Sequence, residues 1–208
     1  MFGIHDFSVF LLTGILLNLT PGPDTFYILG RSMAQGRGAG VASVLGISTG
    51  SLVHTFAAAF GLSAFLAASA SAFLAIKLAG AAYLVYLGAR MLFGRASATT
   101  IPAAFSSSGF WPVYRQGLLT NVLNPKVALF FLAFMPQFIA ADSPSKFAAF
   151  ITLGLSFIIT GTLWCLCLAW FSSQLGDRLR ASTRVSEVLN RTAGALFVFL
   201  GARLATTK

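Results

Sequence analysis

Two short segments of this chain combine charged and amide side chains with prolines, inside runs that are otherwise apolar. The first reads Asn18-Leu-Thr-Pro-Gly-Pro-Asp24 and the second reads Asn121-Val-Leu-Asn-Pro-Lys126. A carboxylate and an ammonium group can bind oppositely charged groups or exchange a proton, and amides both donate and accept hydrogen bonds. The candidate site residues are therefore these two charges and the polar residues beside them: Asp24, Lys126, Asn18, Thr20, Asn121 and Asn124.

Prolines and a glycine predict that a helix is interrupted in each segment. Pro21 and Pro23 lack an N–H and their rings clash with the preceding turn, while Gly22 tolerates dihedral angles that a helix cannot use. Pro125 takes the corresponding place in the second segment. Unwound backbone inside a membrane is tolerated only where protein or a water-filled cavity covers it. We predict two broken helices that meet at a cavity; the alternative is that each proline only kinks its helix for packing.

Asp24 is the one carboxylate placed inside an apolar run, and its position needs a physical explanation. An aspartate at the centre of a membrane helix costs roughly 2.5–3.5 kcal/mol, whereas a place in the first turn of a helix returns only about 0.3–1 kcal/mol. Capping alone does not offset the cost, so an ionic partner, a bound cation or protonation is expected. Lys126, at the matching place in the other segment, is the candidate partner. A plain helix cap is the alternative interpretation.

The elements that must position these residues are membrane-spanning helices. Of the 208 residues, 57% are hydrophobic and only 9% are charged, against roughly 25% charged in an average soluble domain. The net charge of +9 comes mostly from residues between apolar runs, which indicates membrane topology and no nucleic-acid partner. Each run has about the 17–25 residues that a bilayer requires. We predict an all-α membrane protein with six transmembrane helices, over residues 7–29, 40–67, 72–93, 113–139, 146–171 and 188–205.

The chain divides into two similar halves of three helices each. Three pairs of segments match in the same order: 14–18 with 117–121, 45–48 with 153–156, and 79–90 with 193–203. We predict a first repeat over residues 1–93, a linker loop over 94–112 and a second repeat over 113–208. Because each half has an odd number of spans, the second must start on the opposite side of the membrane. Such inverted repeats recur in secondary transporters, with the solute site near the midplane.

Three other features have ordinary structural interpretations. Cys165 and Cys167 point about 200° apart on a helix, so they are expected to be small apolar filler and not a disulfide or redox pair. The stretch from Gly46 to Gly50 matches the G-x-S-x-G pattern of hydrolases, but its helical context favours close helix packing. His54 either relays protons or is only hydrogen-bonded to a neighbour. No cofactor or metal motif is found, and no enzyme activity is expected.

The two proline segments and a glycine-rich loop after the first of them resemble the LysE/RhtB family of bacterial amino-acid exporters. The matching stretches are Thr20-Pro-Gly-Pro-Asp24, Gln35-Gly-Arg-Gly-Ala-Gly40 and Gly117-Leu-Leu-Thr-Asn-Val-Leu-Asn-Pro-Lys126. The likeness extends from about residue 7 to 203. The Pro-Gly-Pro-Asp form is closer to the homoserine/threonine branch than to the lysine-export branch, in which a Gln-Asn pair follows the Gly-Pro.

The resemblance implies an inner-membrane secondary transporter. Its substrates would be neutral amino acids, similar to homoserine and threonine, or close derivatives, exported by proton antiport. A membrane carrier of thiols or electrons from the same superfamily is the first alternative, but it has cysteines near these prolines and neither segment here contains one. An intramembrane hydrolase built on Ser48 is the second, and the helical context of this serine disfavours it. Flux of labelled amino acids with and without a proton gradient separates the three.

A mechanism follows from the placement of the two charges. Ionised Asp24 is expected to bind the substrate ammonium, and protonation from the periplasm releases it. Lys126 and the N-terminal end of the half-helix are expected to bind the substrate carboxylate.

The positive-inside rule places both termini in the periplasm. The cytoplasmic side then holds Arg31, Arg37, Arg90, Arg95, Arg115, Arg178, Arg180, Arg184 and Arg191, and the periplasmic side holds Lys77, Lys146, Arg203 and Lys208. Small residues on the third helix of each half, Gly80, Gly88, Gly194 and Gly201, are expected to pack the two halves together, with a homodimer as the alternative.

Overall fold

The computed structural model describes residues 2–62 and 109–172, together with helical residues scattered within 78–93 and 191–206. This described part is helical, and its one strand-like feature is an isolated bridge between Ile4 and Ile139. The main helices are α1 (Phe7–Leu19), α2 (Pro23–Gln35), α3 (Arg37–Ala57), α6 (Phe110–Val122), α7 (Pro125–Leu129) and α8 (Lys146–Trp170). A π-helical turn, Ala58–Leu62, extends α3, and turns at Phe130–Phe134 and Met135–Phe138 extend α7.

Both predicted helix interruptions are confirmed, and each follows from a residue that precedes a proline. Proline disfavours the helical conformation of the residue before it. Thr20, Gly22 and Asn124 each precede a proline and are extended, with ψ angles of 121°, −174° and 108°. Pro23 and Pro125 then begin α2 and α7, where the missing N–H has no intrahelical partner to lose. The same local rule therefore breaks both helices.

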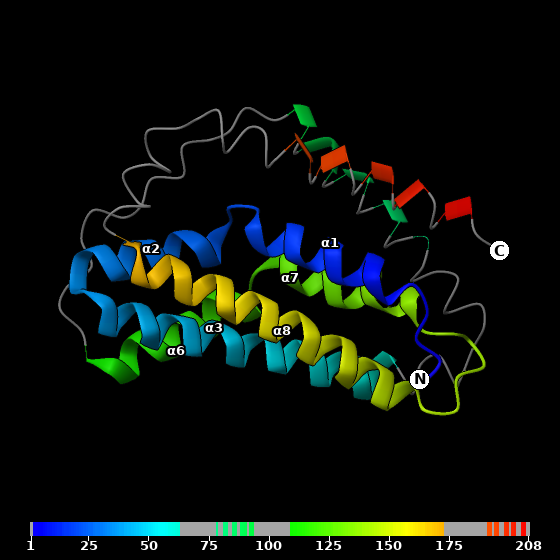
Figure 1. Ribbon diagram of the computed structural model, residues 1–208, viewed down its shortest axis with the longest axis horizontal. Helices are drawn as coiled ribbons and strands as arrows, with labels where there is room; N and C mark the ends of the chain where they lie inside the picture. The colour runs from blue at the N-terminus through cyan, green and yellow to red at the C-terminus, as the bar shows by residue number, and fades with distance from the viewer. Residues whose placement is uncertain are drawn as a thin grey trace.

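The two broken helices run in opposite directions (Figure 1). The α1–α2 pair crosses the view from the N-terminal end of the bundle, and α3 returns alongside it. The α6–α7 pair follows the direction of α3, and α8 returns against it. The most extensive contacts of α3 are with α6 and then with α8. These helices therefore form one bundle around α3.

Two described helical segments are long and apolar enough to cross a membrane, Arg37–Gly61 and Lys146–Trp170. The α6–α7 pair adds a third if its two arms, bent by 48°, form one span, and α1 is apolar but shorter. The predicted helices over 72–93 and 188–205, with the stretches just before them, lie largely outside the described residues. The same holds for most of the 94–112 linker, at whose end α6 already begins. The six-span arrangement therefore stays a prediction.

The connection expected between the first two spans is wrong. The predicted spans stop at residue 29 and resume at residue 40, whereas α2 continues to Gln35 and α3 starts at residue 37. Gly36 alone joins the two helices. Its φ of 84° is a left-handed conformation that glycine adopts without steric cost, which lets the chain reverse within one residue.

Arg31 lies inside the bundle, although its charge predicted a loop position. Its side chain is only 6% exposed. The guanidinium donates a hydrogen bond to Gln116 of α6 and lies 5.6 Å from the centre of the Tyr27 ring. The Tyr27 hydroxyl in turn donates to the carbonyl of Val113 at 2.7 Å. An amide and an aromatic ring from two helices thus accommodate a charge that apolar surroundings alone would exclude.

Apolar side chains fill the two ends of the bundle separately. One cluster joins α1, the turns after α7 and the first part of α8, and it is rich in phenylalanine: Phe10, Phe130, Phe131, Phe134, Phe138, Phe150 and Phe157. The rings of Phe130 and Phe157 are 4.7 Å apart. The other cluster joins α2, the first part of α3, α6 and the last part of α8, with Tyr27, Ile28, Val44, Ile47 and Leu168 among its members. The helix breaks lie between the two clusters in sequence.

Described residues of the 78–93 stretch pack on those of the 191–206 stretch through glycines. A Cβ added to Gly88 would be 2.5 Å from the carbonyl oxygen of Gly194, and one added to Gly201 would be 2.8 Å from that of Ala81. Only glycine permits this approach of two backbones. The contact joins the two predicted halves within one chain, as the glycine pattern predicts; Gly80 lies outside the described residues.

Candidate functional site

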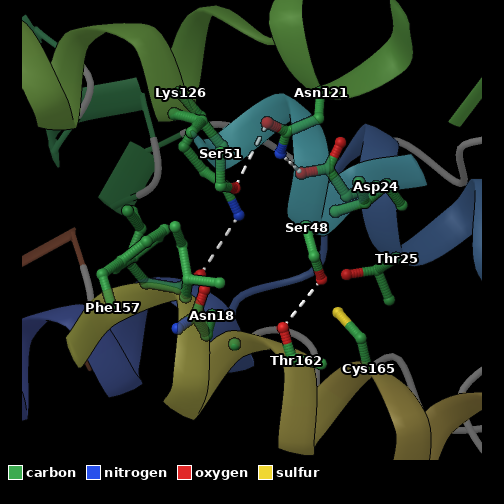
Figure 2. A pocket seen from close by; sticks show the side chains of 15 residues that line it. Asn18, Asp24, Thr25, Ser48, Ser51, Asn121, Lys126, Phe157, Thr162 and Cys165 are labelled. Atoms are coloured by element: carbon green, nitrogen blue, oxygen red, sulfur yellow. Dashed lines mark hydrogen bonds between the residues drawn. The ribbon is translucent and has the colours of Figure 1, made fainter. Parts of the chain in front are cut away.

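A small cavity lies where the two helix breaks face α3 and α8 (Figure 2). Its volume is about 40 Å³, enough for roughly three water molecules. In Figure 2, Asn121 and Asp24 lie on one side, and Phe157, Thr162 and Cys165 of α8 form the opposite wall. The lining residues come from six helices: Leu17, Asn18, Asp24, Thr25, Ile47, Ser48, Ser51, Asn121, Lys126, Val127, Phe157, Ile158, Gly161, Thr162 and Cys165.

Asp24 is held by an asparagine of the other broken helix. Its Oδ2 accepts a hydrogen bond from Nδ2 of Asn121 at 2.8 Å, across 97 residues of sequence. Its Oδ1 is shielded from solvent and has no hydrogen-bond partner within the described residues, and Asn124 lies beside the carboxylate. Asp24 makes no hydrogen bond to the N–H groups of its own helix in this part of the chain. It is therefore more than a plain helix cap.

The hydrogen bond from Asn121 offsets much of the free-energy cost of placing Asp24 inside a membrane helix. A hydrogen bond to a charged group is worth about 1.5–3 kcal/mol and the first turn of a helix about 0.3–1 kcal/mol, which together approach the roughly 2.5–3.5 kcal/mol cost of insertion. Lys126 is the partner that the sequence leads us to expect. Within the described residues Asp24 and Lys126 form no direct ion pair, because the Lys126 ammonium donates to backbone carbonyls instead. The two opposite charges line the same cavity and attract each other without contact.

Lys126 joins the second break to the first. Its Nζ donates to the carbonyl oxygens of Leu17, at 3.1 Å, and Thr20, at 2.9 Å. These carbonyls end α1, where a helix leaves acceptors free and favours a positive charge. Gly22 leaves room for the contact, since an added Cβ would be 3.1 Å from Nζ. Thr20 therefore contributes its carbonyl, while its hydroxyl donates to Leu16 at 2.7 Å.

Asn18 and Asn121, which occupy matching repeat positions, each pack against a glycine of the other half. The amide of Asn18 lies 3.1 Å from the position of a Cβ on Gly161, and Oδ1 of Asn121 lies 2.7 Å from that on Gly50. Asn18 also donates to the hydroxyl of Thr160 at 3.5 Å. Both asparagines line the cavity, so each contributes an amide from one half to a site that the two halves share.

Asn124 and His54 both bind backbone groups at the second break. Oδ1 of Asn124 accepts from the backbone N–H of Lys126 at 3.0 Å, which caps α7, while its Nδ2 is buried without a partner in the described part. Nε2 of His54 is 3.2 Å from the carbonyl oxygen of Asn121 and must be the donor, because a carbonyl only accepts. The His54 ring stacks on Phe131. The hydrogen-bonded interpretation of His54 is the one that the geometry supports.

The G-x-S-x-G stretch is part of a helix and packs against α6, as its helical context predicts. A Cβ on Gly46 would overlap the carbonyl oxygen of Tyr114 and would be 2.9 Å from the backbone nitrogen of Leu118. Ser48 is in hydrogen-bond contact with Thr162 of α8, with 2.7 Å between their hydroxyl oxygens. Ser48 therefore links α3 to α8 and is not on a strand-to-helix turn.

The wall of the cavity that α8 forms is not among the site residues predicted from the sequence. Its residues Phe157, Ile158, Gly161, Thr162 and Cys165 follow the three- and four-residue spacing of a single helix face. Small and polar residues on one face of an apolar helix are the signal that could have identified it. Cys165, expected as apolar filler, lines the cavity, whereas Cys167 is exposed, and both thiols are free. No cluster of His, Cys, Asp or Glu suited to a metal occurs in the described ranges.

Known proteins match this chain along nearly its whole length. The LysE type translocator family matches residues 15–208, which include both helix breaks and the α8 wall. A leucine efflux protein of Salmonella typhimurium is 27% identical over 205 residues, covering 99% of this chain and 97% of that protein. An uncharacterized membrane protein of Pseudomonas aeruginosa is 30% identical over 208 residues, covering 98% and 96%. No solved structure matches the chain. This chain, whose described part is helical with a cavity between two broken helices, belongs to the LysE type translocator family.

Proposed function

We propose that this protein exports neutral amino acids across the bacterial inner membrane in exchange for protons. One observation carries the proposal: Asp24 and Lys126 have opposite charges, line the same cavity and are not paired with each other. A zwitterionic amino acid has the two complementary charges on one carbon atom. The name of the Salmonella relative, a leucine efflux protein, supports amino acids as the substrate class.

The two charged residues offer one position for each end of a zwitterion. Oδ1 of Asp24 has no hydrogen-bond partner within the described residues, and a buried unpaired acceptor is unfavourable by about 1–3 kcal/mol. A substrate ammonium would satisfy it. Lys126 uses two of its three N–H donors on α1. The third, together with the free N–H groups in the first turn of α2, would bind the substrate carboxylate.

Lys126 would also couple binding to movement of the broken helices. In the structure its ammonium group ties α7 to the end of α1 through Leu17 and Thr20. A substrate carboxylate competes with these carbonyls for the same donors. Binding would therefore weaken the contact between the two breaks, and the helices on either side of them could then move apart.

Alternating access fits the two apolar clusters at the ends of the bundle. A cavity of about 40 Å³ holds water but no amino acid, so it must open to admit a substrate. The phenylalanine-rich cluster closes it toward the N-terminal end, and the cluster around Tyr27 and Ile28 closes it toward the other end. We propose that the two clusters separate in turn.

An inverted repeat, with repeats over 1–93 and 113–208, would give these two openings equivalent geometry. It is supported by the opposite directions of α1–α2 and α6–α7 and by the reciprocal contacts of Asn18 and Asn121 with glycines of the opposite half. The orientation with periplasmic termini is supported by charge. Arg37 begins α3 and Arg115 lies in the second turn of α6, at the end of the bundle opposite the N-terminus.

Proton coupling is assigned to Asp24, which is the one carboxylate that lines the cavity in the described part of the chain. Ionised Asp24 would hold the substrate ammonium. A proton entering from the periplasm would neutralise the carboxylate and release the ammonium, and the empty carrier would return with the proton. The direction of transport would then follow the proton gradient.

The test is transport by purified protein in liposomes loaded with labelled leucine or threonine. An imposed proton gradient is expected to accelerate efflux, and dissipating the gradient with an uncoupler is expected to remove the acceleration. Lys126→Met is expected to abolish efflux, whereas Lys146→Met, at the start of α8 and outside the cavity, is the matched control that retains it. Efflux that ignores the gradient, or that survives Lys126→Met, would contradict the proposal.

A further inference from the structure

We propose that the cavity face of α8 is the subsite for the substrate's side chain and that it selects aliphatic amino acids. The inference rests on the proposed export function and deepens it. The subsite consists of Phe157, Ile158, Gly161, Thr162 and Cys165. These residues are called the α8 wall below.

The position of the charges directs the side chain toward the α8 wall. Asp24, Asn121 and Lys126 come from the two broken helices, and α8 forms the opposite wall of the cavity (Figure 2). A zwitterion whose two charged groups are bound at the breaks therefore extends its third substituent toward α8. The wall itself contains no charged residue. Basic and acidic side chains would be buried there without a partner, which is strongly unfavourable.

Three hydroxyl groups around the α8 wall already have partners, whereas that of Thr25 has none within the described residues. Ser48 and Thr162 are bonded to each other with 2.7 Å between their oxygens, and Ser51 donates to Oδ1 of Asn121 at 3.3 Å. The Thr25 hydroxyl can pair with a substrate hydroxyl, so hydrogen bonding alone does not exclude threonine or homoserine. A larger aliphatic side chain buries more apolar surface against Phe157 and Ile158 than these hydroxylated side chains do. Apolar contact is therefore the reason why the wall favours an aliphatic side chain such as that of leucine.

Ile158 and Gly161 set the size of this subsite. Ile158 is half-buried and lines the cavity, one residue before Ile159, which is 59% exposed on the outer face of the helix. Gly161 lies against Asn18, whose amide nitrogen is 3.1 Å from the position of an added Cβ. Shortening Ile158 enlarges the space for a substrate, while a side chain at Gly161 would push Asn18 into the cavity.

Ile158 faces the cavity and Ile159 faces outward, so the same substitution at the two positions gives a test variant and its matched control. In liposomes, Ile158→Ala is expected to raise the ratio of phenylalanine to alanine efflux on the order of tenfold, the usual effect of a small change in a hydrophobic pocket. Ile159→Ala is expected to leave the ratio unchanged. An unchanged ratio in Ile158→Ala, with wild-type efflux intact, would overturn the subsite alone. Absence of amino-acid efflux by the wild-type protein would overturn the proposed function as well.

The two native cysteines supply a binding readout that does not depend on transport. Cys167→Ser leaves Cys165 on the α8 wall as the one thiol, and Cys165→Ser leaves only the exposed Cys167. Leucine is expected to slow the reaction of Cys165 with a small methanethiosulfonate reagent several-fold, threonine less so and lysine not at all. Cys167 is expected to react at the same rate with every amino acid. Stronger protection by threonine than by leucine, or none by either, would overturn the assignment.

Discussion

Gly46 is the position at which the packing of α3 on α6 is tested most sharply. An added Cβ would overlap the carbonyl oxygen of Tyr114 and would lie 2.9 Å from the backbone nitrogen of Leu118. Both groups are backbone and cannot rotate away, so Gly46→Ala forces the two helices apart. Gly38 lies on the same helix, and a Cβ there would have no atom within 4 Å. Gly38→Ala is therefore the matched control.

The expected loss of stability can be estimated from these contacts. Overpacking of this kind costs about 1–3 kcal/mol, and the better helix propensity of alanine returns at most about 1 kcal/mol. We expect a net destabilisation of roughly 1–2 kcal/mol by Gly46→Ala, which for a protein of this size lowers Tm by about 2–8 °C. Gly38→Ala gains the better helix propensity of alanine and introduces no clash, so its Tm should equal or exceed that of the wild-type protein.

The assay is the fraction of monodisperse protein that survives heating in mild detergent, followed by size-exclusion chromatography. Export should fall together with stability. Asn121 is part of α6, packs against Gly50 of α3 and donates a hydrogen bond to Asp24, so a shift of α6 also disturbs the site. A Gly46→Ala protein as stable as the wild type would refute the close contact between α3 and α6. Equal losses in Gly46→Ala and Gly38→Ala would show that glycine flexibility, and not space, matters in α3.

Three further outcomes are expected. Asn121→Leu removes the donor to Asp24 and should lower stability by about 1.5–3 kcal/mol in thermal unfolding, together with loss of export; an unchanged variant would exclude this hydrogen bond. Gly88→Leu should separate the 78–93 and 191–206 stretches and reduce the yield of folded protein, whereas normal yield would contradict their contact. A reporter fused after Lys208 should be active only in the periplasm, and cytoplasmic activity would reverse the orientation.

The helix breaks were predictable because their cause is local. The residue before a proline avoids the helical conformation whatever surrounds it, so Thr20, Gly22 and Asn124 could be assigned without knowledge of the fold. The same reasoning fails for Arg31. Its burial depends on Gln116 and Tyr27, which approach it only after α2 and α6 have packed. A charge alone therefore predicted a loop where the chain forms a helix.

Of the six candidate site residues, Asn18, Asp24, Asn121 and Lys126 line the cavity and Thr20 and Asn124 do not, and the contacts among them could not be predicted. Asp24, Lys126 and the asparagines stood out because polar side chains inside apolar runs are costly. Which of them contact one another depends on where each long side chain reaches. Lys126 is five residues after Asn121 in sequence, yet it extends to Leu17 and Thr20 of the other half. The α8 wall could not be predicted because its small and apolar residues are of the types common in any membrane helix.

Efflux from liposomes that contain the Asp24→Asn protein tests the central claim most directly. Asparagine keeps the size of the side chain and can still accept the hydrogen bond from Asn121, so the protein should fold and purify like the wild type. It cannot titrate or hold an ammonium as an anion. We expect efflux of labelled leucine to lose its acceleration by an imposed proton gradient and its dependence on pH. Efflux at the wild-type rate with the wild-type pH dependence would contradict the account and leave Asp24 with a structural role.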